Sequence, residues 1–204
     1  MKILIVAATA METASLRRDF SEYSAITFLH TGIGMVNTAW ELGQYLAIHT
    51  PDCAINVGVA GSFDRSISLG EVVEITEDTF SELGAEDHDH FLTLADMGFS
   101  APQTFGATAD FPLAYAPLPQ VRGITVNTVH GNAENIARAA AKWQPVAETM
   151  EGAAFFQTMR SKGVPCRAFR GISNYVEPRN RAAWQLFSAA ENAQKFVQTM
   201  LLNA

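Results

Sequence analysis

Cysteine is scarce in this sequence, with only Cys53 and Cys166 among 204 residues. Two cysteines are too few for the disulfide framework that holds small secreted proteins together. Both lie in apolar runs typical of buried strands, so we expect reduced thiols that pack as small hydrophobic groups. The sequence therefore excludes a disulfide scaffold.

Charge is also scarce, and positive charge is scarcer than negative. Charged residues make up 17% of the chain, and 14 Lys and Arg oppose 21 Asp and Glu, for a net charge of −7. Binding to a phosphate backbone requires a basic surface, so a nucleic-acid partner is excluded. The hydrophobic content of 48% excludes a disordered chain, because such a chain buries too little apolar surface to offset its ordering entropy.

Long apolar runs are missing as well. The first one, residues 3–8, is too short to cross a bilayer. Glu12, Arg17 and Arg18 follow it at once, which is unlike the cleavage region of a signal peptide. We therefore expect a cytoplasmic protein that has no membrane partner.

Several well-known site motifs are absent. The turn after the first strand reads Ala-Ala-Thr-Ala at residues 7–10, and residues 32–34 lack the third glycine of a dinucleotide fingerprint. No phosphate-binding loop, nucleophile elbow or zinc-protease motif is present. His88-Asp89-His90 is a candidate metal site, but a solvated acidic loop gives the same pattern. We therefore expect no metal and no cofactor.

What is present is an alternation of strands and helices. Apolar runs predict strands at residues 3–8, 26–30, 53–59, 71–75, 123–129, 145–148 and 166–172. Periodic segments predict helices at residues 11–20, 36–48, 134–143, 150–162 and 181–202, the last with Trp184, Phe187, Ala190 and Ala193 on its apolar side. This alternation predicts a three-layer α/β/α fold with a central mixed sheet, forming a single domain over residues 1–204.

Residues 80–120 interrupt the alternation. They hold half of the prolines and show little periodicity, which predicts a long irregular excursion. Long loops in compact domains usually serve as lids or partner contacts. Phe99, Phe105 and Phe111 would suit a subunit interface, or the segment folds back on its own domain.

Polar or small residues follow the predicted strands, where ligands bind in open α/β sheets. They are Glu12, Gly32-Ile33-Gly34, Ala60-Gly61, Thr128-Val129 and Ser173-Asn174. Glu12 and Glu151 are candidate functional acids, although an ordinary acid in the first turn of a helix has the same placement. His130 is expected to be a loop donor rather than a catalyst.

Taken together, five segments resemble the nucleoside phosphorylase and nucleosidase superfamily. They are Glu12, Thr31-Gly32-Ile33-Gly34, residues 56–61 (Asn-Val-Gly-Val-Ala-Gly), residues 150–154 (Met-Glu-Gly-Ala-Ala) and Ile172-Ser173-Asn174. Within that superfamily the sequence is most similar to the futalosine hydrolases, which are purine nucleosidases. Adenine-specific cousins, the methylthioadenosine/S-adenosylhomocysteine nucleosidases, have Asp where Asn174 stands and Ser where Val59 stands.

The resemblance implies a role for each matching residue. Glu12 would be the general base that activates water, and Asn174 would hold the departing base. Glu151 and the backbone of Met150 would bind the ribose hydroxyls, and Ile33 would line the pocket for the 5′ substituent. The base pocket is expected to be completed by Ala60, Gly61, Thr128 and Val129. Arg179 or Arg181 is a candidate partner for a substrate carboxylate, with a solvated arginine pair as the alternative.

Asn174 also favours one substrate class on chemical grounds. A neutral amide has no proton to give to adenine N7, but it can hold the N7 and O6 edge of a 6-oxopurine, whose anion leaves more easily than that of adenine. The expected reaction is hydrolysis of futalosine to hypoxanthine and dehypoxanthine futalosine in menaquinone biosynthesis.

Three alternatives remain open at this stage: an adenine-releasing nucleosidase, a phosphorylase, and a non-catalytic nucleoside-binding module. A phosphorylase needs arginines at the phosphate, and neither residues 9–11 nor residues 31–34 contain one. As in other superfamily members, we expect a homodimer or a homo-oligomer built from dimers.

Overall fold

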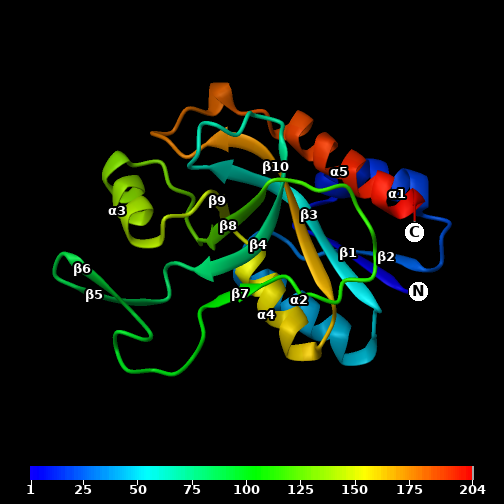
Figure 1. The fold of residues 1–204 in the computed structure, drawn as a ribbon, viewed down its shortest axis with the longest axis horizontal. Coiled ribbons are helices and arrows are strands. Elements are labelled where there is room, and N and C mark those ends of the chain that lie inside the picture. The colour runs from blue at the N-terminus through cyan, green and yellow to red at the C-terminus, as the bar shows by residue number, and fades with distance from the viewer. Residues whose placement is uncertain (204) are drawn as a thin grey trace.

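Apolar runs form the centre of a mixed eight-stranded sheet (Figure 1). The structure, a computed structural model, describes residues 1–203, so Ala204, the last residue of the expected domain, lies outside the described residues. The strands are β1 (Ile3–Ala7), β2 (Ile26–His30), β3 (Cys53–Ser62), β4 (Val72–Phe80), β7 (Thr104–Gly106), β8 (Gln120–Thr125), β9 (Ala147–Thr149) and β10 (Cys166–Tyr175). A separate hairpin consists of β5 (Gly84–Asp87) and β6 (His90–Thr93).

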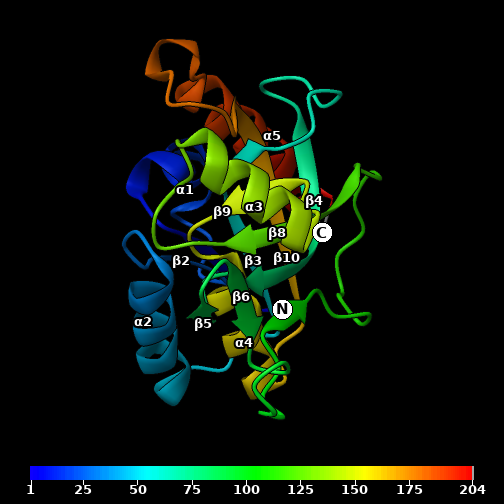
Figure 2. The same ribbon diagram turned by 90° about the vertical axis from the view of Figure 1, so that its left-hand side faces the viewer.

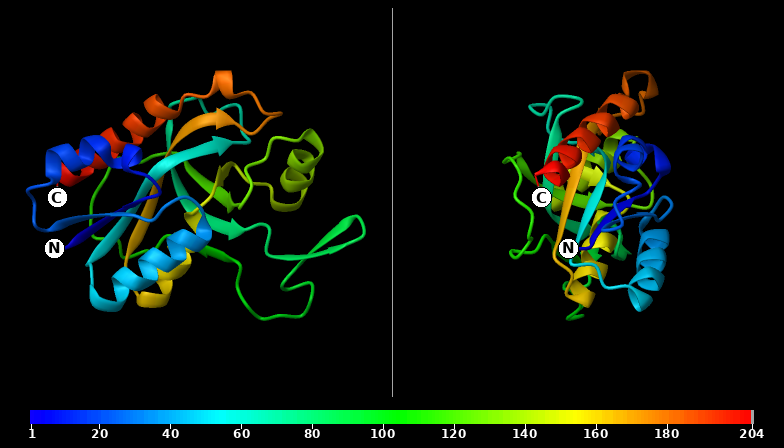
Figure 3. Two further views of the ribbon diagram at one scale, coloured as in Figure 1. Left: turned by 180° about the vertical axis from the view of Figure 1, so that it is seen from behind. Right: turned by 90° about the vertical axis from the view of Figure 1, so that its right-hand side faces the viewer.

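Helices cover both faces of the sheet, as the alternation predicts. They are α1 (Ala14–Phe20), α2 (Met35–Ile48), α3 (Ala133–Trp143), α4 (Gly152–Lys162) and α5 (Leu186–Leu202). Helices α1 and α5 lie on one face, α2 and α4 lie on the other, and α3 stands at the side (Figures 1 and 3). The expected three-layer α/β/α architecture is confirmed. In residues 1–203 no helix is both long and apolar enough to cross a bilayer.

Strand β1 shows why its apolar run is continuous. Successive side chains of a strand point to opposite faces. Leu4 and Val6 accordingly pack into the core under α2 and α4, whereas Ile3, Ile5 and Ala7 pack into the core under α1 and α5. A strand that is buried on both faces has no polar side, so the run reads as unbroken. Cys53 and Cys166 are fully buried, as expected, and burial raises the pKa of their thiols to about 11 and about 12.

Five of the strands close into a ring. Strand β3 pairs with β10, β10 with β4, β4 with β8, β8 with β9, and β9 returns to β3. The β3–β9 and β10–β4 pairs are antiparallel, and the others in the ring are parallel. As a result, the end of β3 lies between β9 and β10, which brings together chain segments far apart in sequence.

The expected C-terminal helix over residues 181–202 is wrong in its first turn. Arg181–Ala183 forms a 3₁₀ turn, and α5 begins only at Leu186. The Gln185 N–H donates to the Ser173 carbonyl at 2.7 Å, which ties the start of the helix to β10. Phe187 is 79% exposed, against expectation, while Ala190 and Ala193 are buried as expected.

Residues 80–120 are less irregular than expected. They contain the β5–β6 hairpin, which extends away from the sheet (Figure 1) and stands in front of it in the view of Figure 2, and β7, which joins the sheet beside β4. Phe105 is buried against the sheet, and Phe111 packs beside the α1 and α5 core. Only Phe99 of the three aromatics is exposed, at 60%. The part of this segment from β7 onward therefore folds back on its own chain, whereas the β5–β6 hairpin does not.

Candidate active site

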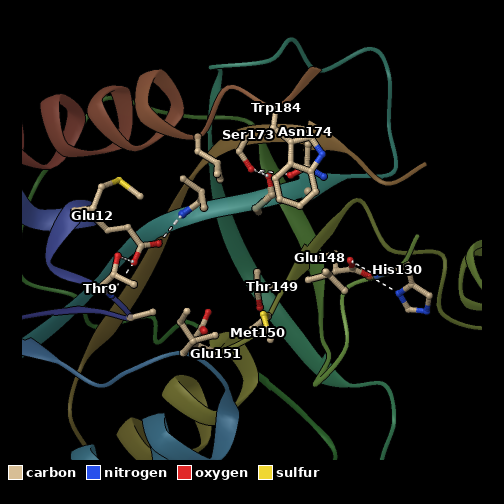
Figure 4. Close-up of a pocket in the computed structure, with 18 of the residues that line it drawn as sticks. Thr9, Glu12, His130, Glu148, Thr149, Met150, Glu151, Ser173, Asn174 and Trp184 are labelled. Carbon is tan, nitrogen blue, oxygen red and sulfur yellow. Dashed lines mark hydrogen bonds and ion pairs between the residues drawn. The ribbon is translucent and has the colours of Figure 1, made fainter. Parts of the chain in front are cut away.

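A cavity of about 340 Å³ opens at the strand ends where polar residues were expected to meet. That volume is in the range of small-molecule sites. Figure 4 shows Glu12 and Glu151 on one side of it, Glu148 and His130 on the opposite side, and Asn174 with Trp184 between them. The lining comprises Ala8, Thr9, Met11, Glu12, Ile33, Val59, Ala60, Gly61, Val129, His130, Glu148, Thr149, Met150, Glu151, Ser173, Asn174, Arg179, Trp184 and Leu186.

Glu12 is held in place from three sides. It lies in a 3₁₀ turn, Ala10–Thr13, directly after β1, and is only 7% exposed. The Thr9 N–H and hydroxyl both donate to its Oε2 at 2.9 Å, and the Val59 N–H donates to its Oε1 at 3.3 Å. A Cβ on Gly58 would stand 2.7 Å from that Oε1, so glycine is needed there for the carboxylate to lie against β3. Glu12 is thus a buried, fixed carboxylate at the cavity wall.

Glu151 comes from the junction between β9 and α4. The Gly34 N–H donates to its Oε1 at 2.8 Å. Gly34 has a φ of +96°, a backbone conformation that residues other than glycine rarely adopt. This conformation directs the Gly34 N–H toward the Glu151 carboxylate. Burial raises the pKa of Glu151, and the Gly34 hydrogen bond and the charge of Arg170 act in the opposite direction.

Arg170 lies fully inside the protein behind these two acids. It projects from β10 and is 2% exposed. Its guanidinium donates to the Asn56 carbonyl at 3.1 Å, to the Phe169 carbonyl at 3.0 Å and to the Asn56 side chain. Burial lowers its pKa, and the charges of Glu151, Glu12 and Asp78 raise it. The cation therefore balances the negative charge of the cavity wall from beneath.

Asn174 is positioned by its own neighbours on β10. The Ser173 hydroxyl donates to its Oδ1 at 2.8 Å, and its Nδ2 donates to the Tyr175 carbonyl at 3.0 Å. A side-chain amide has two donor hydrogens and two acceptor lone pairs. One donor and one acceptor position of Asn174 therefore remain for a ligand.

Glu148 and His130 form a pair that the sequence did not reveal as a site feature. The Glu148 side chain is 4% exposed and that of His130 16%. The His130 N–H donates to Glu148 Oε1 at 3.0 Å, and its Nδ1 contacts Oε2. The hydrogen bond to Glu148 raises the pKa of His130, which stabilises the imidazolium.

Nearly all of the expected site residues line the cavity. Those that do are Glu12, Ile33, Ala60, Gly61, Val129, Met150, Glu151, Asn174 and Arg179. Thr128 is an exception, because the expected strand over residues 123–129 ends at Thr125 and Thr128 is exposed in the following bend. Arg181 is also exposed and outside the lining, whereas Arg179 stacks on Trp184, with 5.4 Å between its guanidinium carbon and the ring centroid.

Two of the missed residues left a signal in the sequence. Arg170 is a charged residue within the apolar run of β10, and Glu148 is one within the short buried strand β9. A charge in a strand buried on both faces requires a partner, and such groups are frequently functional. Trp184 left none, because its place depends on where α5 begins.

The histidines of the candidate metal site do not line the cavity. His88 and His90 stand in the exposed turn of the β5–β6 hairpin. Within residues 1–203, no cluster of three His, Cys, Asp or Glu side chains is arranged to hold a metal ion.

Comparison with known proteins agrees with the cavity geometry. The sequence is 30% identical to the futalosine hydrolase of Thermus thermophilus over 190 residues, which are 87% of this chain and 82% of that one. It is 26% identical to the 5′-methylthioadenosine/S-adenosylhomocysteine nucleosidase of Chromohalobacter salexigens, over 98% and 96% of the two chains. The futalosine hydrolase structure from Helicobacter pylori has the same fold, with a TM-score of 0.84 at 16% identity over 100% of this chain and 98% of that one.

The family assignment follows from a broader match. The family model described as "Phosphorylase superfamily" matches residues 10–202, which include every strand after β1 and both acids of the cavity wall. The chain therefore belongs to the phosphorylase superfamily, and the resemblance found in its five sequence motifs is confirmed.

Proposed function

We propose that this protein hydrolyses the N-glycosidic bond of futalosine, releasing hypoxanthine and dehypoxanthine futalosine, as a step of menaquinone biosynthesis. The observation that carries the proposal is the pairing of a fixed, buried carboxylate, Glu12, with an amide, Asn174, across one cavity. Relatives named futalosine hydrolase, at 30% and 32% identity, support the same choice.

In the proposed reaction the sugar becomes cationic while negative charge collects on the purine. Glu12 takes a proton from water as the water oxygen attacks the anomeric carbon, and the electron pair of the broken bond leaves with the base. A positioned general base typically contributes about 10²–10⁴-fold. Glu151 accepts hydrogen bonds from the ribose hydroxyls, and its charge favours the cationic sugar. Asn174 donates to N7 as charge builds there.

The charges around the cavity favour water rather than phosphate as the nucleophile. Arg170 is buried beneath the wall, donates to Asn56 and Phe169 and does not line the cavity, whereas Arg179 is the arginine among the lining residues. Glu12 and Glu151 would repel a phosphate dianion at the sugar end. A phosphorylase reaction is therefore disfavoured.

Release of adenine from methylthioadenosine or S-adenosylhomocysteine is the second candidate. A relative with that nucleosidase name aligns over 98% of this chain, although at 26% identity. The amide at position 174 separates the two candidates, because it cannot deliver the proton that adenine N7 needs on departure.

One assay tests the proposal. The purified protein is incubated with futalosine, inosine and methylthioadenosine, with and without phosphate, and the released base is measured. We expect hypoxanthine from futalosine at the same rate in both buffers. Dependence on phosphate, faster release of adenine from methylthioadenosine, or tight binding without turnover would each contradict the proposal.

The protein is further proposed to act as a homodimer through one face of α2. Val36 and Trp40 on that helix are 74% and 64% exposed, and they border a shallow apolar groove completed by Met35, Ala39, Phe80, Ala154 and Gln157. Glu41 is the one charged residue of α2, so this face can meet a second copy of itself without charge repulsion across the contact. Ile33, 58% exposed at the cavity rim, lies just before the helix, so a second copy there would border the substrate site.

A further inference from the structure

The proposed chemistry leaves one buried carboxylate of the cavity without a role. Glu148 is 5% exposed, yet it is far along the cavity from Glu12 and Glu151, on the side shown opposite them in Figure 4. Burying a carboxylate is costly unless it is paired and hydrogen-bonded. An ion pair that served only to join β9 to the loop before α3 would have no need to line the cavity, as this pair does.

Strand register places Glu148 and Asn174 on either side of the same residue. On β3, Gly61 pairs with Glu148 of β9 on one side and with Asn174 of β10 on the other. Two strand spacings separate the flanking residues, which is about 10 Å. A Cβ on Gly61 would stand 3.0 Å from Val176 Cγ2 and 3.1 Å from Asn174 Nδ2, so glycine leaves room beside the amide. A flat ring can lie over Gly61 with its edge reaching both groups.

Glu148 also has unused hydrogen-bonding capacity. An ionised carboxylate offers about four acceptor positions. His130 occupies one on each oxygen. The other acceptor positions of Glu148 remain for a ligand, because Glu148 lines the cavity. An ionised carboxylate accepts hydrogen bonds and cannot donate them. Glu148 therefore suits a ligand that presents an N–H at this point.

We propose that Glu148 determines base specificity by accepting a hydrogen bond from N1–H of a 6-oxopurine while Asn174 holds its N7 and O6 edge. This inference rests on the proposed function and extends it to the choice of base. In a 6-oxopurine the atoms N7, O6 and N1 follow one another along one edge, and N1 bears a hydrogen. In a 6-aminopurine N1 bears a lone pair instead, which faces the carboxylate unfavourably.

His130 is the positioning residue in this arrangement. Its backbone N–H and its Nδ1 each contact one oxygen of Glu148, and these two contacts fix the orientation of the carboxylate. The His130 ring packs edge-on to Phe63, with 6.5 Å between ring centroids, which limits its rotation.

Binding of free bases tests the proposal without any requirement for turnover. Dissociation constants are measured by calorimetry for hypoxanthine, adenine and 1-methylhypoxanthine, which lacks the N1 hydrogen. Wild-type protein should prefer hypoxanthine to each of the other two by about tenfold or more, because a site built around a hydrogen bond rejects analogues that lack it. Equal affinity for hypoxanthine and 1-methylhypoxanthine would overturn the proposal, and this comparison needs no variant.

Two substitutions at Glu148 sharpen the test. Glu148→Gln should weaken hypoxanthine binding about tenfold or more and reduce the preference over adenine, since the charged acceptor is lost. Glu148→Ala should in addition admit 1-methylhypoxanthine, because the methyl group takes the space of the carboxylate. A folded Glu148 variant that keeps the wild-type ratio of hypoxanthine to adenine affinity would overturn the assignment. A purely structural role for the pair would change the melting temperature and leave that ratio unchanged.

Glu134→Gln is the matched control. Glu134 is an exposed acid four residues beyond His130, pairs with Arg138 and does not line the cavity, so its replacement should leave base preference unchanged. Failure of this inference is distinguishable from failure of the proposed function. Unselective base binding with intact futalosine hydrolysis rejects the role of Glu148 alone, whereas selective base binding without hydrolysis rejects the reaction alone.

Discussion

Arg170 carries the positive charge that offsets the acids of the cavity wall. It is buried among Glu12, Glu151 and Asp78, and each of these charges raises its pKa against the lowering effect of burial. Removal of one partner from a buried charge cluster is costly because the remaining charges lose their compensation. The cluster explains how Glu12 and Glu151 can both stand at one cavity wall.

Glu12 gives the most direct prediction at this scale. Glu12→Gln keeps the size and most hydrogen-bonding geometry of the side chain but removes the base, so kcat should fall by about 10²-fold or more. The melting temperature should fall because Arg170 loses part of its compensation, but the variant should still fold and bind substrate. The matched change Glu22→Gln, at an exposed position, should leave kcat unaltered. Retention of most of kcat in Glu12→Gln would refute the general-base role.

Asn174 is predicted to control which base departs. Asn174→Asp replaces the amide with an acid that can protonate adenine N7 but that repels O6 when ionised. We expect slower release of hypoxanthine from futalosine by about tenfold or more, together with a gain of adenine release from methylthioadenosine. Steady-state rates on both substrates measure this. Wild-type rates on both would show that position 174 does not discriminate.

Arg179 is predicted to hold the carboxylate end of the substrate. Arg179 lines the cavity beside Trp184, whereas Arg181 lies outside it. The sequence alone did not distinguish the two arginines, so replacement of Arg179 tests the contact and replacement of Arg181 is the control. Arg179→Ala should raise KM for futalosine with little change in kcat, because the contact is the same in the ground state and the transition state. Arg181→Ala should leave both constants unchanged, and an unaltered KM in Arg179→Ala would exclude the contact.

At the scale of elements, one side chain joins three strands and a helix. Asp78 on β4 accepts from the Thr125 hydroxyl of β8 at 2.7 Å and from the Thr149 hydroxyl of β9 at 3.0 Å. A Cβ on Gly152, the first residue of α4, would overlap its carboxylate, so the helix begins directly against it. These bonds set the position of the chain from Thr149 to Glu151 and thereby the position of the acid at the cavity wall.

Asp78 predicts a pH dependence of stability. Burial raises its pKa from 3.8 to about 7, so the folded protein retains a proton that the unfolded chain releases. A raised carboxyl pKa means that stability declines as pH rises between these two values. Asp78→Asn removes this contribution, so the variant should gain free energy of unfolding relative to wild type from pH 4 to pH 7.

Denaturant unfolding at a series of pH values measures the effect. Asp89→Asn, in the exposed turn of the β5–β6 hairpin, is the matched control and should follow the wild-type pH profile. Parallel profiles for Asp78→Asn and wild type would contradict the raised pKa.

Element boundaries were predictable where periodicity is strong and local. The unbroken run at residues 3–8 predicts β1 closely, because burial on both faces is visible in the residues themselves. The start of α5 was not predictable, because it depends on a hydrogen bond from Gln185 to Ser173 on a distant strand. The expectation that Phe187 is buried failed for the same reason, because the apolar pattern does not show at which residue the helix begins.

The site followed the same rule. Glu12, Glu151 and Asn174 are adjacent in sequence to strand ends or small residues, and parallel strands bring such ends together. Glu148 was overlooked because it and Asn174 are neighbours only by way of Gly61, which pairs with both. This pairing exists because the end of β3 lies between β9 and β10. Register across a ring of strands is a long-range property that local sequence patterns do not encode.

At the scale of the whole molecule, the proposed dimer would cover the exposed apolar face of α2, where Val36 and Trp40 lie. Trp40→Glu would place a charge opposite its own copy in a symmetric interface, and like charges facing each other there are destabilising. We therefore expect wild-type protein to run as a dimer and Trp40→Glu as a monomer in light scattering coupled to size exclusion. Because Ile33 at the cavity rim adjoins this face, the monomer should also show a higher KM.

Phe187→Glu is the control for that experiment. Phe187 is more exposed than Trp40 but lies on α5, on the opposite face of the sheet, so its replacement should leave the dimer intact. A monomeric wild type would refute the dimer itself. Dissociation by Phe187→Glu but not by Trp40→Glu would place the contact on the α1 and α5 face, and the cavity would then be complete within one chain.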